Sequence, residues 1–140
     1  MLFIVLQCKN LIADVGDMMS VQVIVEGSMN SSNPYFSSSW RRDFAGGFIL
    51  DMGVHFIAGL RMLVGCEVVS VSATTSYVDK SLPPPDNISS LFQLENGCSG
   101  VFVMVFLLDL HRKQFSFFQV NLVRTKENLP IFVLLAKMKM

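Results

Sequence analysis

Asp51 and His55 are the two residues whose types and spacing could do chemistry together. They lie four positions apart in a segment with helical periodicity, so both side chains belong to one face of the predicted helix. A carboxylate beside an imidazole can hold the imidazole tautomer and tune its basicity. Such a histidine can accept the proton of an alcohol while hydride leaves the same carbon. The spacing is therefore compatible with an acid–base pair for alcohol oxidation, and we expect both side chains to be directed away from the solvent-facing positions.

A structural interpretation accounts for the same two residues. Asp51 would favour the positive end of the helix dipole from the first turn, and His55 would be a core histidine with satisfied hydrogen bonds. Against this, burying two ionisable groups in a strongly apolar helix costs free energy unless they are paired or functional. The spacing alone leaves both interpretations open, because such pairs also arise for structural reasons.

The residues around the pair form a longer pattern. Residues 46–55 read Gly-Gly-Phe-Ile-Leu-Asp-Met-Gly-Val-His, which resembles the G-G-x-x-x-D-x-G-x-H signature of the glucose–fructose oxidoreductase, inositol dehydrogenase and MocA family. Trp40-Arg41 precedes the glycines, as in many relatives. The resemblance continues at Leu60-Arg61, Gly65, Val68, Val71, Ala73, Phe92, Gly97 and Gly100. It covers roughly residues 11–106, by motif matching.

This resemblance implies a function. Members of the family have an N-terminal Rossmann domain and a C-terminal α+β domain with a large open sheet. They oxidise or reduce sugars and polyols with NAD or NADP, and many associate through the open sheet. The signature residues, here Asp51 and His55, lie near the substrate, with His55 as the acid/base. Trp40 and Arg41 become candidate substrate contacts.

The departures from the family are equally informative. The sequence has no G-x-G-x-x-G after a strand and no Glu-Lys-Pro, whose lysine completes the catalytic group. We therefore expect this chain to bind no cofactor. Residues 1–10 and 107–140 diverge from the family, so we divide the chain into these two segments and a family-like domain over residues 11–106. The sequence is typical of an internal segment of a longer enzyme, flanked at both ends by residues that do not follow the family.

One helix and several strands must position these residues. Apolar residues at helical spacing predict a helix over residues 49–64, with Leu50, Val54, Ile57, Leu60 and Val64 as its core stripe and Gly65 as its C-terminal cap. A β-branched run over residues 21–25 predicts a strand that enters a polar loop over residues 28–39.

The second half of the chain is predicted to form mainly strands. Residues 67–77 alternate, and residues 88–94 and 100–107 flank Glu95-Asn96-Gly97, a strong hairpin signal. Residues 115–123 and 131–135 could be further strands. This order predicts an α+β fold, a helix packed on an open, mainly antiparallel sheet that is incomplete relative to the family. We expect the apolar segment Val101 to Leu108 to lie beside an unpaired edge and to favour association.

Composition excludes several classes of partner. Lys+Arg and Asp+Glu both number 11 among 140 residues, so a strong attraction to nucleic acid or anionic lipid is absent. No apolar run reaches the roughly 20 residues of a membrane-spanning helix. Cys8, Cys66 and Cys98 lack the C-x-x-C pairing of a zinc site. We expect a cytoplasmic protein with buried thiols, no metal, no nucleic acid and no membrane.

Two hypotheses follow for the chain as a whole. The first is the substrate-side domain of an NAD(P)-dependent sugar or polyol oxidoreductase, inactive alone because the cofactor domain is missing. The second is a non-catalytic interaction module that pairs through its open sheet with itself or with a full-length relative. Arg41, Arg42 and Arg61 could contact an anionic group, but we favour a solvated loop and helix face for them.

Overall fold

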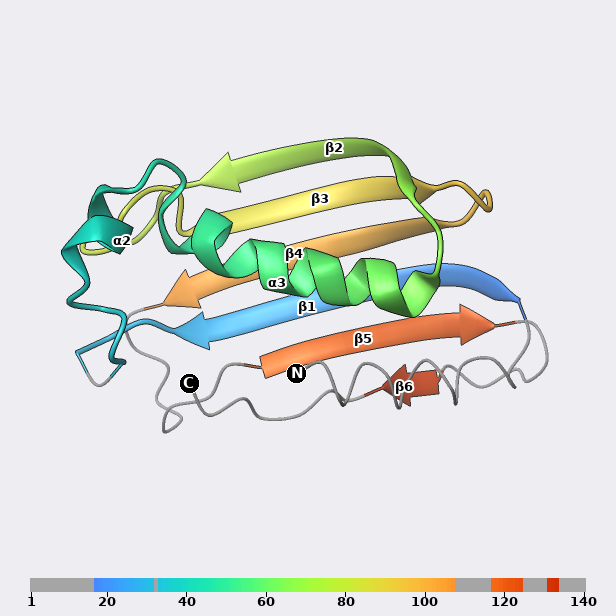
Figure 1. Cartoon of the computed structure of the whole chain (residues 1–140), viewed down its shortest axis with the longest axis horizontal. Coiled ribbons are helices and arrows are strands. Elements are labelled where there is room, and N and C mark those ends of the chain that lie inside the picture. Colours follow the sequence, from blue (N-terminus) through green and yellow to red (C-terminus); the bar gives the residue numbers. More distant parts are fainter. Residues whose placement is uncertain (1–16, 32, 108–116, 125–130, 134–140) are drawn as a thin grey trace.

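The fold is one sheet with one long helix on it (Figure 1). The computed structural model describes residues 17–31, 33–107, 117–124 and 131–133. The elements are β1 (Met18–Ser28), α2 (Ser39–Asp43), α3 (Gly47–Val64), β2 (Val68–Ser76), β3 (Asn87–Leu94), β4 (Ser99–Leu107), β5 (Phe117–Arg124) and β6 (Ile131–Val133). The strand order is β2-β3-β4-β1-β5-β6. The pairing of β1 with β4 is parallel, and the other four pairings are antiparallel. The α+β class and the mainly antiparallel sheet are therefore confirmed.

Strand β4 lies inside the sheet, which corrects our expectation of an open edge beside Val101 to Leu107. β3 pairs with one side of β4 and β1 with the other. β1 ends at Ser28 and β4 begins at Ser99, so 70 residues of chain lie between these paired strands. Local sequence patterns cannot show such a pairing. The expected later strands are present as β5 and β6, although β5 pairs with β1 rather than with β4.

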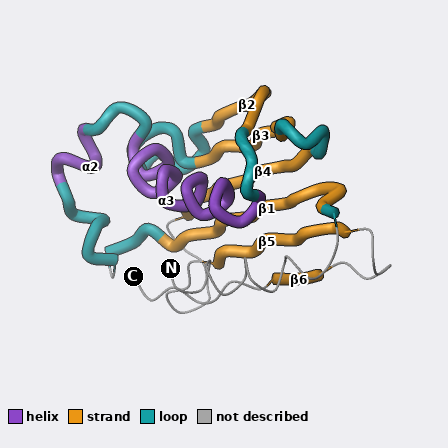
Figure 2. Tube along the Cα trace, turned by 45° about the vertical axis from the view of Figure 1, so that its right-hand side comes forward, coloured by secondary structure: helices purple, strands orange, loops and turns teal. Residues whose placement is uncertain are grey.

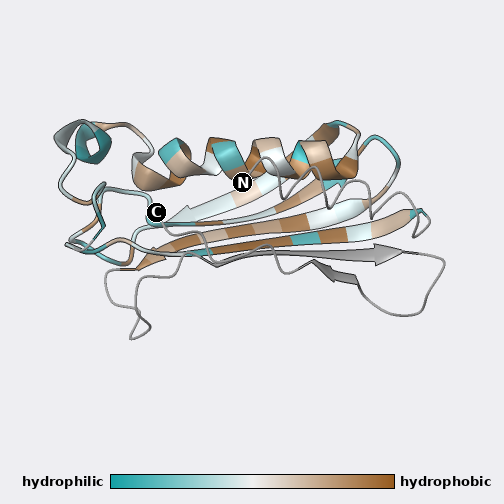
Figure 3. Cartoon of the chain, turned by 60° about the horizontal axis from the view of Figure 1, so that its bottom comes forward, coloured by the Kyte–Doolittle hydropathy of each residue, from teal (hydrophilic) through white to brown (hydrophobic). Residues whose placement is uncertain are grey.

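The core lies between α3 and the inner face of the sheet (Figure 2). The helix contributes Phe48, Phe56, Leu60 and Leu63, and the sheet contributes Val21, Val23, Val25, Phe92, Leu94, Phe102, Met104 and Phe106. The rings of Phe48 and Phe106 meet edge to face with 6.2 Å between centroids. Each fully buried apolar side chain contributes roughly 1.5–3 kcal/mol relative to exposure. The apolar bands along β1 and β4 are visible in Figure 3.

The helix buries only part of the stripe that we expected, since Leu60 is buried and Val64 packs half-buried against the core. Leu50, Val54 and Ile57 are 49%, 54% and 38% exposed. The side of α3 that packs on the sheet includes Gly53 and Gly59, both of which are buried. Because α3 is apolar on most of its surface, two stripes share the helical period. The side that faces the sheet is the one that carries the large residues Phe48, Phe56 and Leu63.

Local signals at the ends of elements are confirmed. Gly65 adopts a left-handed conformation with φ +70°, and its N–H donates to the Arg61 carbonyl at 3.0 Å. Gly97 has φ +84° in the turn between β3 and β4. Both conformations suit glycine, which lacks the Cβ that would clash there.

Helix α3 is long and apolar enough, by length and composition alone, to cross a membrane. In the fold, 39% of it is buried, and its inner stripe forms the core described above. A core helix passes the same test, so this property is weak support for a membrane span.

Candidate functional site

Asp51 and His55 lie one turn apart on α3, as the spacing predicts. Asp51 is half-buried, whereas His55 is exposed. The expectation that both side chains turn away from solvent is therefore wrong for His55. The reason is rotational: Phe56 points into the core, and its neighbour His55 is displaced by about 100° around the helix.

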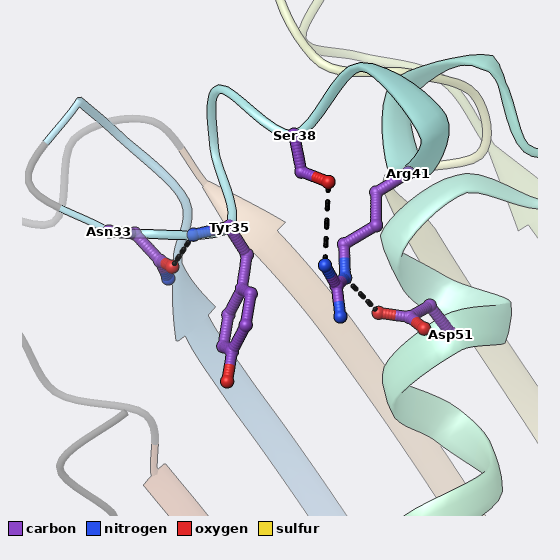
Figure 4. Close-up of polar contacts among 5 residues, drawn as sticks. All are labelled: Asn33, Tyr35, Ser38, Arg41 and Asp51. Atoms are coloured by element: carbon purple, nitrogen blue, oxygen red, sulfur yellow. Dashed lines mark hydrogen bonds and ion pairs between the residues drawn. The ribbon is translucent and has the colours of Figure 1, made fainter.

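Asp51 makes an ion pair with Arg41 (Figure 4). Arg41 Nε donates to Asp51 Oδ2 at 2.8 Å, and the side chains are 21% and 19% exposed. Arg41 Nη1 also donates to the Ser38 hydroxyl at 3.4 Å. Within the described residues, neither Asp51 nor any other group forms a hydrogen bond or ion pair with His55. The predicted carboxylate–imidazole contact is thus replaced by a carboxylate–guanidinium contact.

Both structural alternatives for the pair fail in their original form. Helix α3 begins at Gly47 and has no acidic residue in its first turn, so Asp51 lies beyond the turn where the dipole acts. His55 is exposed and is no core histidine. The structural role that remains for Asp51 is its ion pair with Arg41.

Aromatic rings hold the Arg41 guanidinium. Its carbon lies 4.2 Å from the ring centroid of Trp40 and 4.5 Å from that of Tyr35. Trp40 is 55% exposed and meets Phe44 edge to face at 6.3 Å. The structure thus brings the predicted residues Trp40 and Arg41 to the same end of α3 as Asp51. Sequence reasoning missed Tyr35, because nothing in the linear pattern links it to Arg41.

The loop that carries Tyr35 is fixed by its own hydrogen bonds. The buried Asn33 donates to the Ser28 carbonyl at 3.2 Å and accepts the Tyr35 N–H at 2.9 Å. Arg42 donates to the Ser81 carbonyl at 2.7 Å and lies over the Phe36 ring. Arg42 therefore connects α2 to the loop after β2. We had expected a solvated side chain, and this expectation is wrong for Arg42.

An apolar groove of about 560 Å³ runs along the other flank of α3. The helix lines it with Leu50, Val54 and Ile57, and the sheet with Val71, Ala73 and Ile88. Arg61, at one end, pairs with Glu67 in an exposed ion pair. Hydrogen bonding to Glu67 and its negative charge raise the pKa of Arg61 above its usual value. The groove and the Asp51 cluster are separate features of the helix.

The described residues offer no metal site. No group of three His, Cys, Asp or Glu side chains gathers in this part of the chain. Cys66 and Cys98 are half-buried free thiols, and Cys98 Sγ lies 2.6 Å from the Met18 carbonyl, to which it can donate. Cys8 lies outside the described residues.

The family model for the GFO/IDH/MocA C-terminal domain matches residues 5–120. The chain belongs to this family. In the matched region, the signature residues 46–55 form the turn into α3 and its first half. The motifs in the sequence alone had reached from residue 11 to 106.

Three similar proteins place the chain within longer relatives. A dehydrogenase, FPY6, from Fusarium mangiferae is 35% identical over 96 residues, which cover 65% of this chain and 28% of the relative. The WlbA dehydrogenase from Bordetella pertussis, solved with NADH and UDP-GlcNAcA, is 23% identical with a TM-score of 0.69, covering 86% of this chain and 37% of that one. Scyllo-inositol dehydrogenase from Lactobacillus casei, solved with NAD(H) and scyllo-inositol, is 20% identical with a TM-score of 0.67, covering 91% and 38%.

These coverages show that the chain spans between about a quarter and two fifths of the relatives it matches. The homologues are dehydrogenases, and the matched part is their C-terminal domain. The two structures support the fold.

The described residues do not form a dinucleotide-binding site. Such a site needs a strand, a glycine-rich turn and a helix N-terminus in succession. Gly46-Gly47 opens α3, but within the described residues the element before it is the short helix α2 and not a strand. The N–H of Gly47 donates to the Phe44 carbonyl at 2.9 Å and is not free for a phosphate.

Proposed function

We propose that this chain forms the substrate side of an NAD(P)-dependent oxidoreductase that acts on the CH–OH groups of sugars or polyols. The observation that carries the proposal is the cluster at the first half of α3, where Asp51 pairs with Arg41 and Arg41 lies against Trp40. The exposed His55 follows Asp51 one turn later on α3. Relatives solved with UDP-GlcNAcA or scyllo-inositol support the substrate class. NAD or NADP would be held by a nucleotide-binding domain, and the chain alone is inactive.

In this proposal His55 is the acid/base. Its exposed imidazole can reach a hydroxyl group of a substrate bound over this end of α3. It accepts the hydroxyl proton as the carbon is oxidised, and returns it in the reverse direction. The nicotinamide, when bound, takes up the hydride. Trp40 and Arg41 line the substrate side.

The isolated chain is expected to bind neither NADH nor NADPH and to turn over no sugar or polyol. Hydride transfer needs the cofactor carbon held against the substrate, and the described residues lack the elements that hold it. Calorimetric titration should show no saturable heat. Joining the chain to the nicotinamide-binding domain of a relative should restore turnover of at least one sugar or polyol.

Saturable binding of NADH to the isolated chain at micromolar concentration would contradict the assignment of the cofactor to another domain. A joined protein that binds NADH yet turns over no sugar or polyol would contradict the substrate-side assignment itself.

A second candidate function is an interaction module that pairs through the sheet. The face opposite α3 carries no helix in the part of the chain that the structure describes (Figure 3). On β2, β3 and β4 this face has no charged side chain, and Leu91 is 57% exposed on it. This uncharged part of the face adjoins β1, which places the exposed Glu26 on the same face beside Val105. An uncovered surface without charge, as on β2, β3 and β4, favours association with a second copy or with a full-length relative.

We therefore expect the purified chain to associate at tens of micromolar, a range where exposed apolar surface commonly does so. Size-exclusion chromatography with light scattering measures the mass. Leu91→Lys should shift the chain toward monomer, because it places a charge in the middle of the open face. Ser81→Lys, in the exposed loop after β2, is the matched control. A monodisperse wild-type monomer would argue against this module.

A further inference from the structure

We propose that Asp51 is a positioning residue that acts through Arg41 on Trp40. In this arrangement the ion pair fixes the guanidinium between two aromatic rings, and the rings then form a platform for the C–H face of a sugar or polyol ring. The ligand class rests on the proposed function, whereas the clamp itself rests on the contacts of the described residues.

The geometry supports a clamp rather than a chance contact. Asp51 and Arg41 meet at 2.8 Å with about one fifth of each side chain exposed. Two partly desolvated charges are costly unless each has its partner. A guanidinium over an aromatic ring is stabilised by roughly 0.5–2 kcal/mol, depending on exposure, and Arg41 has two such rings. Removing Asp51 therefore removes the group that sets the position of the guanidinium.

His55 does not share this clamp. Among the described residues the polar partner of Asp51 is Arg41, and His55 lies exposed one turn further along α3. A carboxylate that orients a histidine has to hydrogen-bond to the imidazole. Asp51 instead directs its Oδ2 at the loop side, toward α2 (Figure 4). The two signature residues thus have separate tasks.

Trp40 is suited to a ring with an apolar face. More than half of its surface, 55%, is exposed, although Arg41 lies against its ring. The face of an indole carries partial negative charge and attracts C–H groups, which are weakly positive. A sugar or cyclic polyol with equatorial hydroxyls presents axial C–H groups on its ring faces. Such a ligand can stack on the exposed part of Trp40.

The test uses the only tryptophan of the chain, so its near-UV circular dichroism band reports on Trp40 alone. That band requires fixed side-chain packing. Asp51→Asn and Arg41→Met should each abolish most of the band while the far-UV spectrum is kept. The double variant should lose no more than either single variant, because both act on one contact. His55→Ala and Asp43→Asn are the controls and should keep the band.

The second readout is titration of the 140-residue chain with scyllo-inositol, followed by Trp40 fluorescence. The dissociation constant should rise about tenfold, equivalent to 1.4 kcal/mol, in Asp51→Asn and Arg41→Met. It should change less than twofold in Asp43→Asn, which removes an exposed charge of α2. A band that survives Asp51→Asn, or that disappears in His55→Ala, would overturn the clamp. A further outcome is that the variants lose the band but the wild type binds no scyllo-inositol. The clamp would then stand, whereas the polyol ligand and the proposed substrate side would be rejected.

Discussion

Turnover should fall by about 10² to 10⁴ when His55 is replaced by alanine in the chain joined to a nicotinamide-binding domain, as is typical for the loss of a general base. The signature contains two ionisable side chains, Asp51 and His55. The exposed His55 is the one without a polar partner among the described residues. It is therefore available to a substrate hydroxyl. In the proposed role, His55 handles the proton in the transition state, so KM should change far less than kcat. Steady-state kinetics with a sugar or polyol measures both.

Two variants sharpen this result. His55→Gln keeps a hydrogen-bonding side chain but cannot take up the proton, so it should be nearly as slow as alanine. His111→Ala, which removes the other histidine of the sequence, is the matched control and should keep the wild-type rate. His111 lies outside the described residues. If His55→Ala retains the wild-type kcat, His55 is a structural residue and the proton acceptor is elsewhere.

The parts of the fold that could be predicted are those fixed by neighbours in the sequence. The periodicity of residues 49–64 and Gly65 gave the helix to within two residues of its observed start. The Glu95-Asn96-Gly97 turn placed the β3–β4 hairpin. Which side of the helix faces the sheet was not predictable from hydropathy, because Leu50 and Val54 are as apolar as the residues that are buried.

Contacts between distant residues account for what the sequence did not show. The parallel pairing of β1 with β4 joins residues about 80 positions apart, and neither strand carries a local mark of its partner. Asp51 and Arg41 are ten positions apart on different helices, so their pairing depends on how the loop returns to α3. The family signature located the cluster, but the partner of Asp51 follows from the packing of Tyr35 and Trp40 around Arg41.

Gly100→Ala should destabilise the fold by about 1–3 kcal/mol or more, the usual cost of overpacking a well-packed core. Gly100 lies on β4 between Phe92 on β3 and Val21 on β1. An added Cβ would overlap the Phe92 ring and would lie 2.6 Å from the Val21 carbonyl oxygen. The ring could turn away, but the carbonyl belongs to the backbone of the parallel β1–β4 pairing. Urea unfolding of the isolated chain measures the change.

Gly53→Ala makes the same chemical change on the helix and is the matched control. Its added Cβ would meet Met104 Sδ at 3.8 Å, an ordinary van der Waals distance. Alanine is also favoured over glycine inside a helix by roughly 0.8–1 kcal/mol. Gly53→Ala should therefore leave the unfolding midpoint unchanged or raise it, whereas Gly100→Ala lowers it. Equal midpoints for the wild type and Gly100→Ala would show that β1 does not approach β4 at this point, and that the β1–β4 pairing places Val21 elsewhere.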